Sequence, residues 1–275
     1  MKIAILTDSS YGTGKTYDNL YKISLPIILP DLKIIEDDKN FTDKKFLEII
    51  NKNFLKTSQT PFEKIIETLK NLLTKYDQVI ICGLAKNLSG QYNQYLLATK
   101  YLELSDRIFV IDSNGVSIIL ERQVMLIQKL IKENKEGKEI QQILNNKNQD
   151  YDCYILSKSW DNLIRSGRIT KLKGFFAKTL KFNFVIKVQN EKLVFDSKHR
   201  SLLAALKYIL TNLKVHQVKE IDVAYGFIEE NILKKMKKII SEYDFKINLY
   251  SKLPKIIMCN TGVKTLAFGV WKNEL

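Results

Sequence analysis

The sequence predicts an α/β protein with two domains, and two observations carry this prediction. Short, unbroken apolar runs alternate with amphipathic segments in the first half of the chain, which is typical of a mainly parallel sheet covered by helices. The pattern changes after a polar, Asn-rich stretch that ends near residue 150. We therefore expect an N-terminal α/β domain with a mainly parallel sheet at 1–150 and a C-terminal domain with a mixed α/β sheet at 151–275.

The first half contains three predicted buried strands, each followed by a polar loop: KIAILT at 2–7, QVIICGL at 78–84 and RIFVID at 107–112. Between them, the prolines of LPIILPDLKIIEDD indicate extended chain. The capping and periodicity signals predict helices at residues 42–51, 60–75, 91–102 and 116–133, and a further short helix is expected within NKEGKEIQQILNNKNQD, before its Asn-rich end.

The start of the second predicted helix is the most informative. Thr60 matches an N-cap, Pro61 the first helical residue and Glu63 the third position of a capping box. This assignment leaves the hydroxyls of Thr57 and Ser58 with no task in starting the helix.

The second half predicts a mixed sheet. DCYILS is a strand, a helix runs to Ser166, and another helix is expected around residues 171–180. FNFVIKVQNEKLVFD alternates about Asn190-Glu191, as an antiparallel hairpin does. Four further elements follow: a helix at 200–213, the strand IDVAYGF, a helix at 229–241 and the strand KINLYSK. A last apolar segment follows these elements.

Composition narrows the function classes. No run approaches the 18 or so apolar residues of a membrane span, and the N-terminus is too polar for a signal peptide, so we expect a cytoplasmic protein. Cys82, Cys153 and Cys259 lie far apart, and the chain has only 2 histidines. This pattern favours buried free thiols over a metal site or disulfides, and no cofactor is expected.

The net charge of +14 leaves nucleic-acid binding as an alternative. The lysines, however, are scattered, and the dense cluster LKKMKKII has the spacing of the solvent face of an amphipathic helix. A second alternative is a nucleotide-binding enzyme that uses the GTGKT loop after the first strand. A P-loop requires a glycine at position 9, and this chain has Ser9.

Three predicted strands end in loops that contain serine: TDSS, GLAKNLSG and VIDSNGVS. Ligands bind at this edge of open parallel sheets. Ser89 and Gly90 precede a helix, whose N-terminal amides favour anions, although Ser89 also fits a simple helix cap. No nucleophile has a basic partner nearby, so the loops indicate binding of a carboxylate or phosphate without catalysis. Arginines at 165, 168 and 200 are further candidates for contact with an anion.

Taken in order, these segments resemble the DegV family of fatty-acid-binding proteins that serve bacterial fatty acid kinase. KIAILTDSS is similar to the family's first strand and turn, TSQTPFE to its TSQPS segment and LSGQYNQ to its LSGTYQSA segment. VIDSNGVS resembles the IDS segment and SGRIT the GGRI segment. The resemblance covers nearly the whole chain.

The resemblance implies a monomeric carrier that is not itself an enzyme. Such a carrier binds a long-chain fatty acid, touches membrane surfaces transiently and presents the carboxylate to a separate kinase for acyl-phosphate formation. By resemblance, Thr57 and Ser89 hold the carboxylate, with Ser58 and Gly90 beside them. Arg168 and Arg200 match the arginines that serve the kinase encounter and phosphoryl transfer.

This chain departs from the family pattern at three places. Ala85 replaces a serine, Ser166-Gly167 replaces a glycine pair, and the C-terminal HTGPG becomes NTGVK. Asn260 therefore stands where the family has the histidine next to the carboxylate. An amide donates a hydrogen bond but cannot become a cation, so Asn260 is expected to bind the carboxylate without a response to pH.

Overall fold

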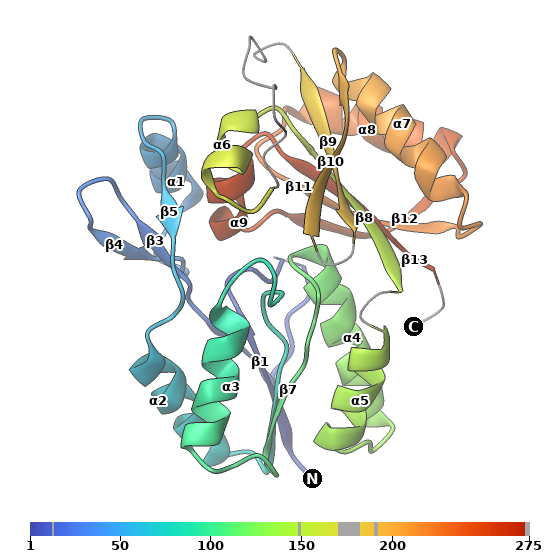
Figure 1. Cartoon of the computed structure of the whole chain (residues 1–275). Helices are drawn as coiled ribbons and strands as arrows, with labels where there is room; N and C mark the ends of the chain where they lie inside the picture. The colour runs from blue at the N-terminus through green and yellow to red at the C-terminus, as the bar shows by residue number, and fades with distance from the viewer. Residues whose placement is uncertain (13, 148–149, 170–181, 190–191, 273–275) are drawn as a thin grey trace. The chain divides into compact units, whose positions relative to one another are not determined.

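The computed structural model describes residues 1–12, 14–147, 150–169, 182–189 and 192–272 (Figure 1). Contacts divide the chain into two compact units. The first is Met1–Gln149 with the short segment Pro254–Ile256, and the second is Asp150–Leu253 with Ile257–Leu275.

The first unit is built on a four-stranded parallel sheet with the order β2-β1-β6-β7. Its strands are β1 (Ile3–Asp8), β2 (Leu20–Ile23), β6 (Gln78–Ile81) and β7 (Ile108–Val110). All side chains of β1 and β7 are buried, as expected of strands covered on both faces.

Two pairs of helices cover this sheet (Figure 1). On one face, α2 (Phe62–Leu73) and α3 (Gln91–Tyr101) pack Leu69 and Tyr95 against apolar strand residues such as Leu6. α4 (Ile118–Lys132) and α5 (Gly137–Lys147) cover the other face. Gly137 lies so close to the Phe109 ring that a Cβ there would overlap it, which explains a glycine inside this helix.

A small antiparallel sheet with the order β4-β3-β5 completes the first unit. It consists of β3 (Pro26–Ile28), β4 (Ile34–Glu36) and β5 (Lys56–Thr57). α1 (Asp43–Ile50) lies between β4 and β5 in the sequence, and the Thr42 hydroxyl accepts a hydrogen bond from the Lys45 amide at 3.3 Å. The predicted Thr42 cap is confirmed.

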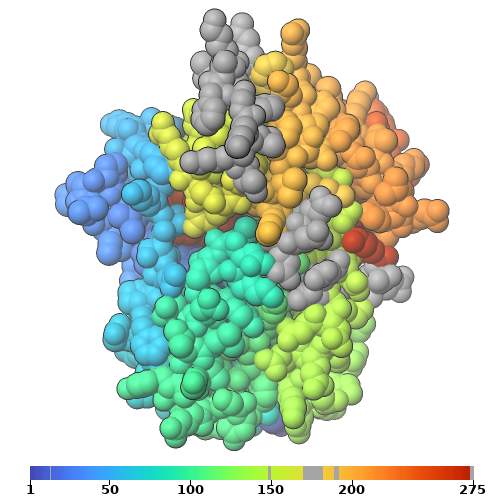
Figure 2. Space-filling view, in the orientation of Figure 1, coloured from blue at the N-terminus to red at the C-terminus, as the bar shows by residue number. Residues whose placement is uncertain are grey.

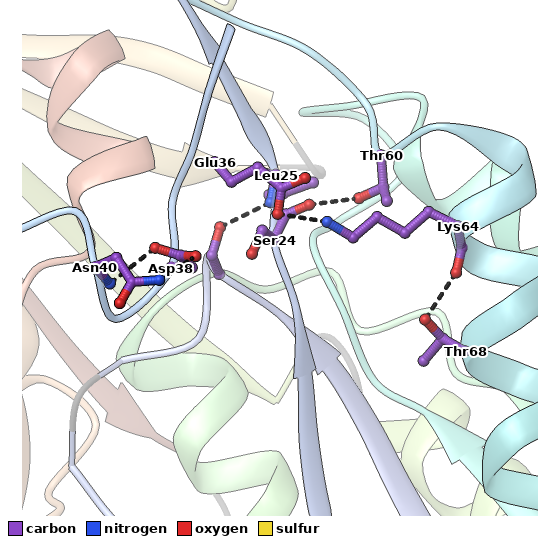
Figure 3. A network of polar contacts seen from close by, with 9 residues as sticks. Ser24, Leu25, Glu36, Asp38, Asn40, Thr60, Lys64 and Thr68 are labelled. Carbon is purple, nitrogen blue, oxygen red and sulfur yellow. Dashed lines mark hydrogen bonds and ion pairs between the residues drawn. The ribbon is translucent and has the colours of Figure 1, made fainter.

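The predicted capping role of Thr60 is wrong. α2 begins at Phe62 with Pro61 as its N-cap, and no side chain caps it. The Thr60 hydroxyl instead donates to the Ser24 carbonyl oxygen at 2.9 Å, as Figure 3 shows. The Thr60 amide donates to Oε1 of Gln91 at 2.8 Å. Tertiary partners have replaced the local capping hydrogen bond, because Thr60 is buried next to them.

The second unit contains a six-stranded mixed sheet with the order β10-β9-β8-β13-β11-β12, in which only β11 and β12 pair in parallel. The strands are β8 (Tyr151–Ser157), β9 (Asn183–Gln189), β10 (Lys192–His199), β11 (Glu220–Tyr225), β12 (Lys246–Lys252) and β13 (Leu266–Trp271). The helices are α6 (Trp160–Arg165), α7 (Leu202–Lys214), α8 (Glu230–Glu242) and the part of α9 (Lys255–Thr261) that follows Ile256. α7 and α8 bury residues such as Leu206 and Met236 against this sheet.

The predicted fold class is confirmed, since a parallel sheet and a mixed sheet are both present. Three elements were not predicted: β2, β5 and α9. The helix expected at 171–180 and the hairpin turn at Asn190-Glu191 lie outside the described residues. Within the part of the chain that the structure describes, no helix is long and apolar enough to cross a membrane.

Candidate functional site

The loops after β1, β6 and β7 meet at the carboxyl edge of the parallel sheet and are tied to one another. The Ser113 hydroxyl, after β7, donates to the Gly83 carbonyl oxygen, after β6, at 2.6 Å. The Ala85 amide donates to the Gly115 carbonyl oxygen at 3.0 Å. The loops therefore converge as the sequence predicts, and their mutual hydrogen bonds fix their positions.

Most serines in these loops stabilise the scaffold. The Ser9 hydroxyl accepts from the Leu25 amide at 3.1 Å, and the Ser10 hydroxyl donates to the Asp8 carboxylate. Ser9, Ser10 and Ser113 are all buried. Ser117, after β7, is also buried, and its hydroxyl has no hydrogen-bond partner among the described residues. In the three loops, the half-buried serine is Ser89, so the expectation that all three loops offer hydroxyls to a ligand narrows to the loop after β6.

Ser89 and Gly90 lie at the start of α3. Gly90 is the N-cap, with φ −70° and ψ 0°, and makes no side-chain capping bond. The Ser89 hydroxyl oxygen accepts from the Gln91 amide at 3.2 Å, so its hydrogen remains a donor for a ligand. Both residues are half-buried. Helix N-termini attract anions, so this hydroxyl lies where a carboxylate is favoured.

Thr57 and Ser58 lie in a segment that contacts the start of α3. Thr57 pairs with Ile27 in the small sheet, and the Ser58 amide donates to the Pro26 carbonyl oxygen at 3.0 Å. The next residue, Gln59, places its carboxamide where a Cβ on Gly90 would lie. The Thr57–Gln59 segment and the Ser89-Gly90 segment are therefore in contact within the first unit. The family resemblance implies that both segments bind the same carboxylate.

Of the two glutamines in this arrangement, Gln91 escaped sequence analysis, and Gln59 is the polar residue that follows Thr57 and Ser58 before the predicted helix. Gln59 packs on Gly90, while Gln91 is fully buried and accepts from the Thr60 amide. A buried glutamine in the first turn of a helix requires an internal partner, but the sequence does not say which residue that partner is.

The GTGKT loop does not have the surroundings of a phosphate site. Gly12 and Gly14 both lie against the carboxylate of Glu121, so closely that a Cβ on either would overlap it. Glu121 is buried on α4, and its carboxyl group occupies the space beside these two glycines that a phosphate would need. The loop also leads into β2, whereas a P-loop leads into a helix. Thr13 lies outside the described residues.

Metal or thiol chemistry finds no support either. Among the described residues, no group of three or more His, Cys, Asp or Glu side chains is placed to hold a metal ion. The three cysteines are buried and unbridged. Burial raises the pKa of Cys153 to about 12 and that of Cys82 still further, so both thiols stay protonated and unreactive at neutral pH.

Arg168 and Asn260 are partners in the second unit. The Arg168 guanidinium donates through Nη1 to Oδ1 of Asn260 at 2.9 Å and to the Ser166 carbonyl oxygen at 3.0 Å. A guanidinium only donates, so Asn260 turns its oxygen toward Arg168 and its NH₂ group away. Burial lowers the pKa of Arg168, which still carries its charge at neutral pH.

Local structure explains where these two side chains lie. Gly167 has φ +71°, a conformation that glycine adopts without strain, and it turns the chain from α6 toward Arg168. At the end of α9, the Asn162 side chain donates to the Cys259 carbonyl oxygen at 3.2 Å, and the Ser157 hydroxyl donates to that of Thr261 at 2.6 Å. Arg200 is exposed just before α7.

The fold and this site define an α/β protein that offers hydroxyl groups and a helix N-terminus at the carboxyl edge of a parallel sheet. The profile of the DegV family, a family of uncharacterised proteins, matches residues 2–273. The chain therefore belongs to the DegV family.

Known proteins resemble the chain along its whole length. A fatty acid-binding protein of Thermotoga maritima is 24% identical, over 98% of each chain. The crystal structure of a DegV lipid-binding protein from Thermotoga maritima superposes with a TM-score of 0.86 at 21% identity, over 98% of each chain. The Fak B3 protein of Streptococcus pneumoniae fatty acid kinase, loaded with linoleic acid, superposes with a TM-score of 0.83 at 19% identity, over 99% of this chain and 100% of its own.

Proposed function

We propose that this protein binds a long-chain fatty acid, shields its acyl chain and presents the carboxylate to a separate fatty acid kinase. In this proposal Thr57, Ser58, Ser89 and Gly90 bind the carboxylate, and Asn260 contributes an amide donor. The protein is a carrier, works in the cytoplasm without a cofactor and leaves the chemistry of acyl-phosphate formation to the kinase.

One observation carries the proposal. The segment Thr57–Gln59 contacts Gly90 at the start of α3, next to the donor hydroxyl of Ser89. Hydroxyls and helix amides bind a carboxylate by charge-assisted hydrogen bonds. The partner of the Ser89 hydroxyl is a backbone amide, which is not a general base, so this hydroxyl suits holding an anion and not attacking a substrate.

The relatives support the same ligand. Membership of the DegV family, a lipid-binding neighbour and a fatty acid kinase B protein loaded with linoleic acid all favour a fatty acid. Burial of an acyl chain contributes about 0.8 kcal/mol per CH₂. The tail therefore supplies most of the affinity, while the polar loops orient the head.

Isothermal titration of delipidated protein with oleate tests the binding step. We expect one oleate per chain, with a heat-capacity change that is negative because apolar surface is buried. Titration with ATP and Mg²⁺ is the matched control for the GTGKT loop, and we expect no heat of binding. Binding of ATP together with no binding of oleate would contradict the proposal.

The kinase step is tested separately through Arg200. We expect Arg200→Ala to retain oleate affinity and to lower acyl-phosphate formation in the presence of a fatty acid kinase by at least about tenfold. Lys235→Ala, which removes an exposed cation on α8, is the control and should leave both the affinity and the rate unchanged. Equal rates of acyl-phosphate formation for the unmutated protein and both variants would mean that Arg200 has no role in presenting the carboxylate to the kinase.

A further inference from the structure

Asp8 is the most deeply buried charged group at the carboxyl edge of the parallel sheet. It is the last residue of β1 and is fully buried. Oδ1 accepts from the Ser10 amide at 3.0 Å and from the Ser10 hydroxyl, and Oδ2 accepts from the Leu84 amide at 2.8 Å and the Tyr95 hydroxyl at 3.3 Å. Every one of these partners is a donor, which is the set that an ionised carboxylate requires. Burial raises its pKa, and the hydrogen bonds oppose that rise.

The bonds to Oδ2 reach both sides of the loop that carries Ser89. Leu84 is at the start of this loop. Tyr95 is one turn into α3, the helix that follows the loop. Gly83 allows the close approach, since a Cβ there would lie 2.5 Å from Oδ2 of Asp8 and 2.9 Å from Cε2 of Tyr95. Asp8 thus fixes the two ends of one loop from a single carboxylate oxygen.

Gln91 extends the connection to the Thr57–Gln59 segment. Its side chain is fully buried, and Oε1 accepts from the Thr60 amide at 2.8 Å. Tyr95 follows Gln91 by four residues on α3, and both side chains are buried. Residues four apart lie on the same face of a helix, so Gln91 and Tyr95 are neighbours on the buried face of α3.

We propose that Asp8, Tyr95 and Gln91 form one positioning unit that holds the Ser89 loop and the Thr57–Gln59 segment in the geometry that binds a carboxylate. None of the three is proposed to touch the ligand. The inference rests on the proposed function for its ligand, because it explains how the carboxylate-binding groups are kept in register. The hydrogen bonds of Asp8 and of the Gln91 carbonyl oxygen tie α3 and these two segments together, and buried hydrogen bonds of this kind favour one arrangement of the loops around them.

The test compares two buried tyrosines of the first unit. Tyr95→Phe removes the hydroxyl that donates to Asp8, and Tyr11→Phe removes one that donates to the Lys15 carbonyl oxygen at 2.8 Å. Each change deletes one oxygen and one hydrogen bond. We expect Tyr95→Phe to weaken oleate binding about tenfold, because it leaves a buried carboxylate oxygen of Asp8 without one of its donors, and Tyr11→Phe to leave the affinity within about twofold of the unmutated protein.

Amide hydrogen exchange on the lipid-free protein gives a second, ligand-independent readout. Tyr95→Phe should speed exchange at the Thr60 and Leu84 amides at least about tenfold more than Tyr11→Phe does. Equal effects of the two variants on affinity and on exchange would overturn the proposal. If the unmutated protein binds no oleate, the proposed function fails, and the exchange rates alone decide whether the positioning unit exists.

Discussion

At the scale of single residues, the site separates hydroxyls that build the scaffold from hydroxyls that face a ligand. The hydroxyls of Ser10 and Ser113 donate inside the protein, to a carboxylate and a carbonyl. The Ser89 hydroxyl accepts from a helix amide and keeps its hydrogen for an external acceptor. This difference, more than the presence of serine in each loop, identifies the candidate carboxylate-binding residues.

Thr57→Ala and Ser89→Ala should each weaken oleate binding by about tenfold or more, because each removes a charge-assisted hydrogen bond. Thr68→Ala is the control, since Thr68 is a half-buried threonine on α2 whose hydroxyl donates to Lys64 of its own helix. Fluorescent fatty acid displacement gives the affinities. An equal loss of thermal stability with and without lipid, and no loss of affinity, would assign Thr57 to structure alone.

Gly90→Ala tests the contact between the two carboxylate-binding segments. The Gly90 backbone is in a conformation that alanine adopts without strain, so we expect stability to change by less than about 1 kcal/mol. The new Cβ displaces the Gln59 carboxamide. Oleate affinity should fall about fivefold, because the Thr57–Gln59 segment moves relative to the Ser89 loop.

The double variant Gly90→Ala/Gln59→Ala removes the overlapping side chain and should regain most of that affinity. The same assay measures both proteins. If the single variant binds oleate as tightly as the unmutated protein, the contact between Gln59 and Gly90 has no part in binding. If the double variant binds oleate more weakly than the single variant, the Gln59 side chain itself contributes to oleate affinity.

At the scale of helices and strands, the start of α2 shows what sequence signals can and cannot determine. Thr60, Pro61 and Glu63 match a capping box, and α2 does begin close to them. The Thr60 hydroxyl is nevertheless used to bind Ser24, a partner 36 residues away in the chain. Local patterns identify where a helix starts, but a buried hydroxyl follows its three-dimensional neighbours.

Strand and helix signals were reliable wherever the elements were long and strongly patterned. The apolar runs predicted β1, β6 and β7, whereas β2 (LYKI) has only 4 residues and alternates weakly. β5 has only 2 residues and exists because it pairs with β3. For the site, sequence alone indicated the segments around Thr57 and Ser89, while Gln91 and Asp8 became visible only through their contacts.

In the second unit, Asp152 joins several elements at one corner of the sheet. It lies on β8, 2.7 Å from Nε2 of His216 after α7, 3.3 Å from Nζ of Lys272 after β13 and 3.6 Å from Nζ of Lys187 on β9. Burial acts to raise its pKa, but these three groups together hold the pKa below its usual range. A depressed carboxylate pKa means that the contribution to stability exists above the unfolded-state pKa and is lost as the pH falls.

Asp152→Asn should therefore destabilise the second unit by about 1–2 kcal/mol at neutral pH, and the difference should shrink as the pH falls below about 3.9, the unfolded-state pKa of aspartate. Both tryptophans, Trp160 and Trp271, lie in this unit, so urea unfolding followed by tryptophan fluorescence reports on it. Asp244→Asn, which breaks the exposed pair with Lys214, is the control and should change stability by less than about 0.5 kcal/mol. Equal losses at neutral and acid pH would contradict the ion-pair account.

At the scale of the whole molecule, each unit carries part of the proposed machinery. Thr57, Ser58, Ser89 and Gly90 belong to the first unit, and Arg168, Arg200 and Asn260 belong to the second. The two domains predicted from sequence, at 1–150 and 151–275, remain a proposal. The segment Pro254–Ile256 belongs by its contacts to the first unit: the Ile256 amide donates to Asp37 at 3.3 Å, and Lys255 lies 3.5 Å from Asp43.

The net charge of +14 makes salt dependence a decisive whole-molecule measurement. If affinity for a fatty acid comes from the buried tail and from short hydrogen bonds, oleate binding should change less than about threefold between 50 and 500 mM NaCl. Binding of a DNA duplex by scattered lysines, in contrast, would fall steeply over that range. Tight duplex binding at physiological salt, with weak and salt-sensitive oleate binding, would favour the nucleic-acid alternative.

The central claim is that this DegV family member carries a fatty acid, and mass spectrometry of lipid extracted from the purified, denatured protein tests it most directly. We predict close to one long-chain fatty acid per chain, and markedly less in the Thr57→Ala/Ser89→Ala double variant. Recovery of no stoichiometric fatty acid, together with no binding of added oleate by the native protein, would contradict the account.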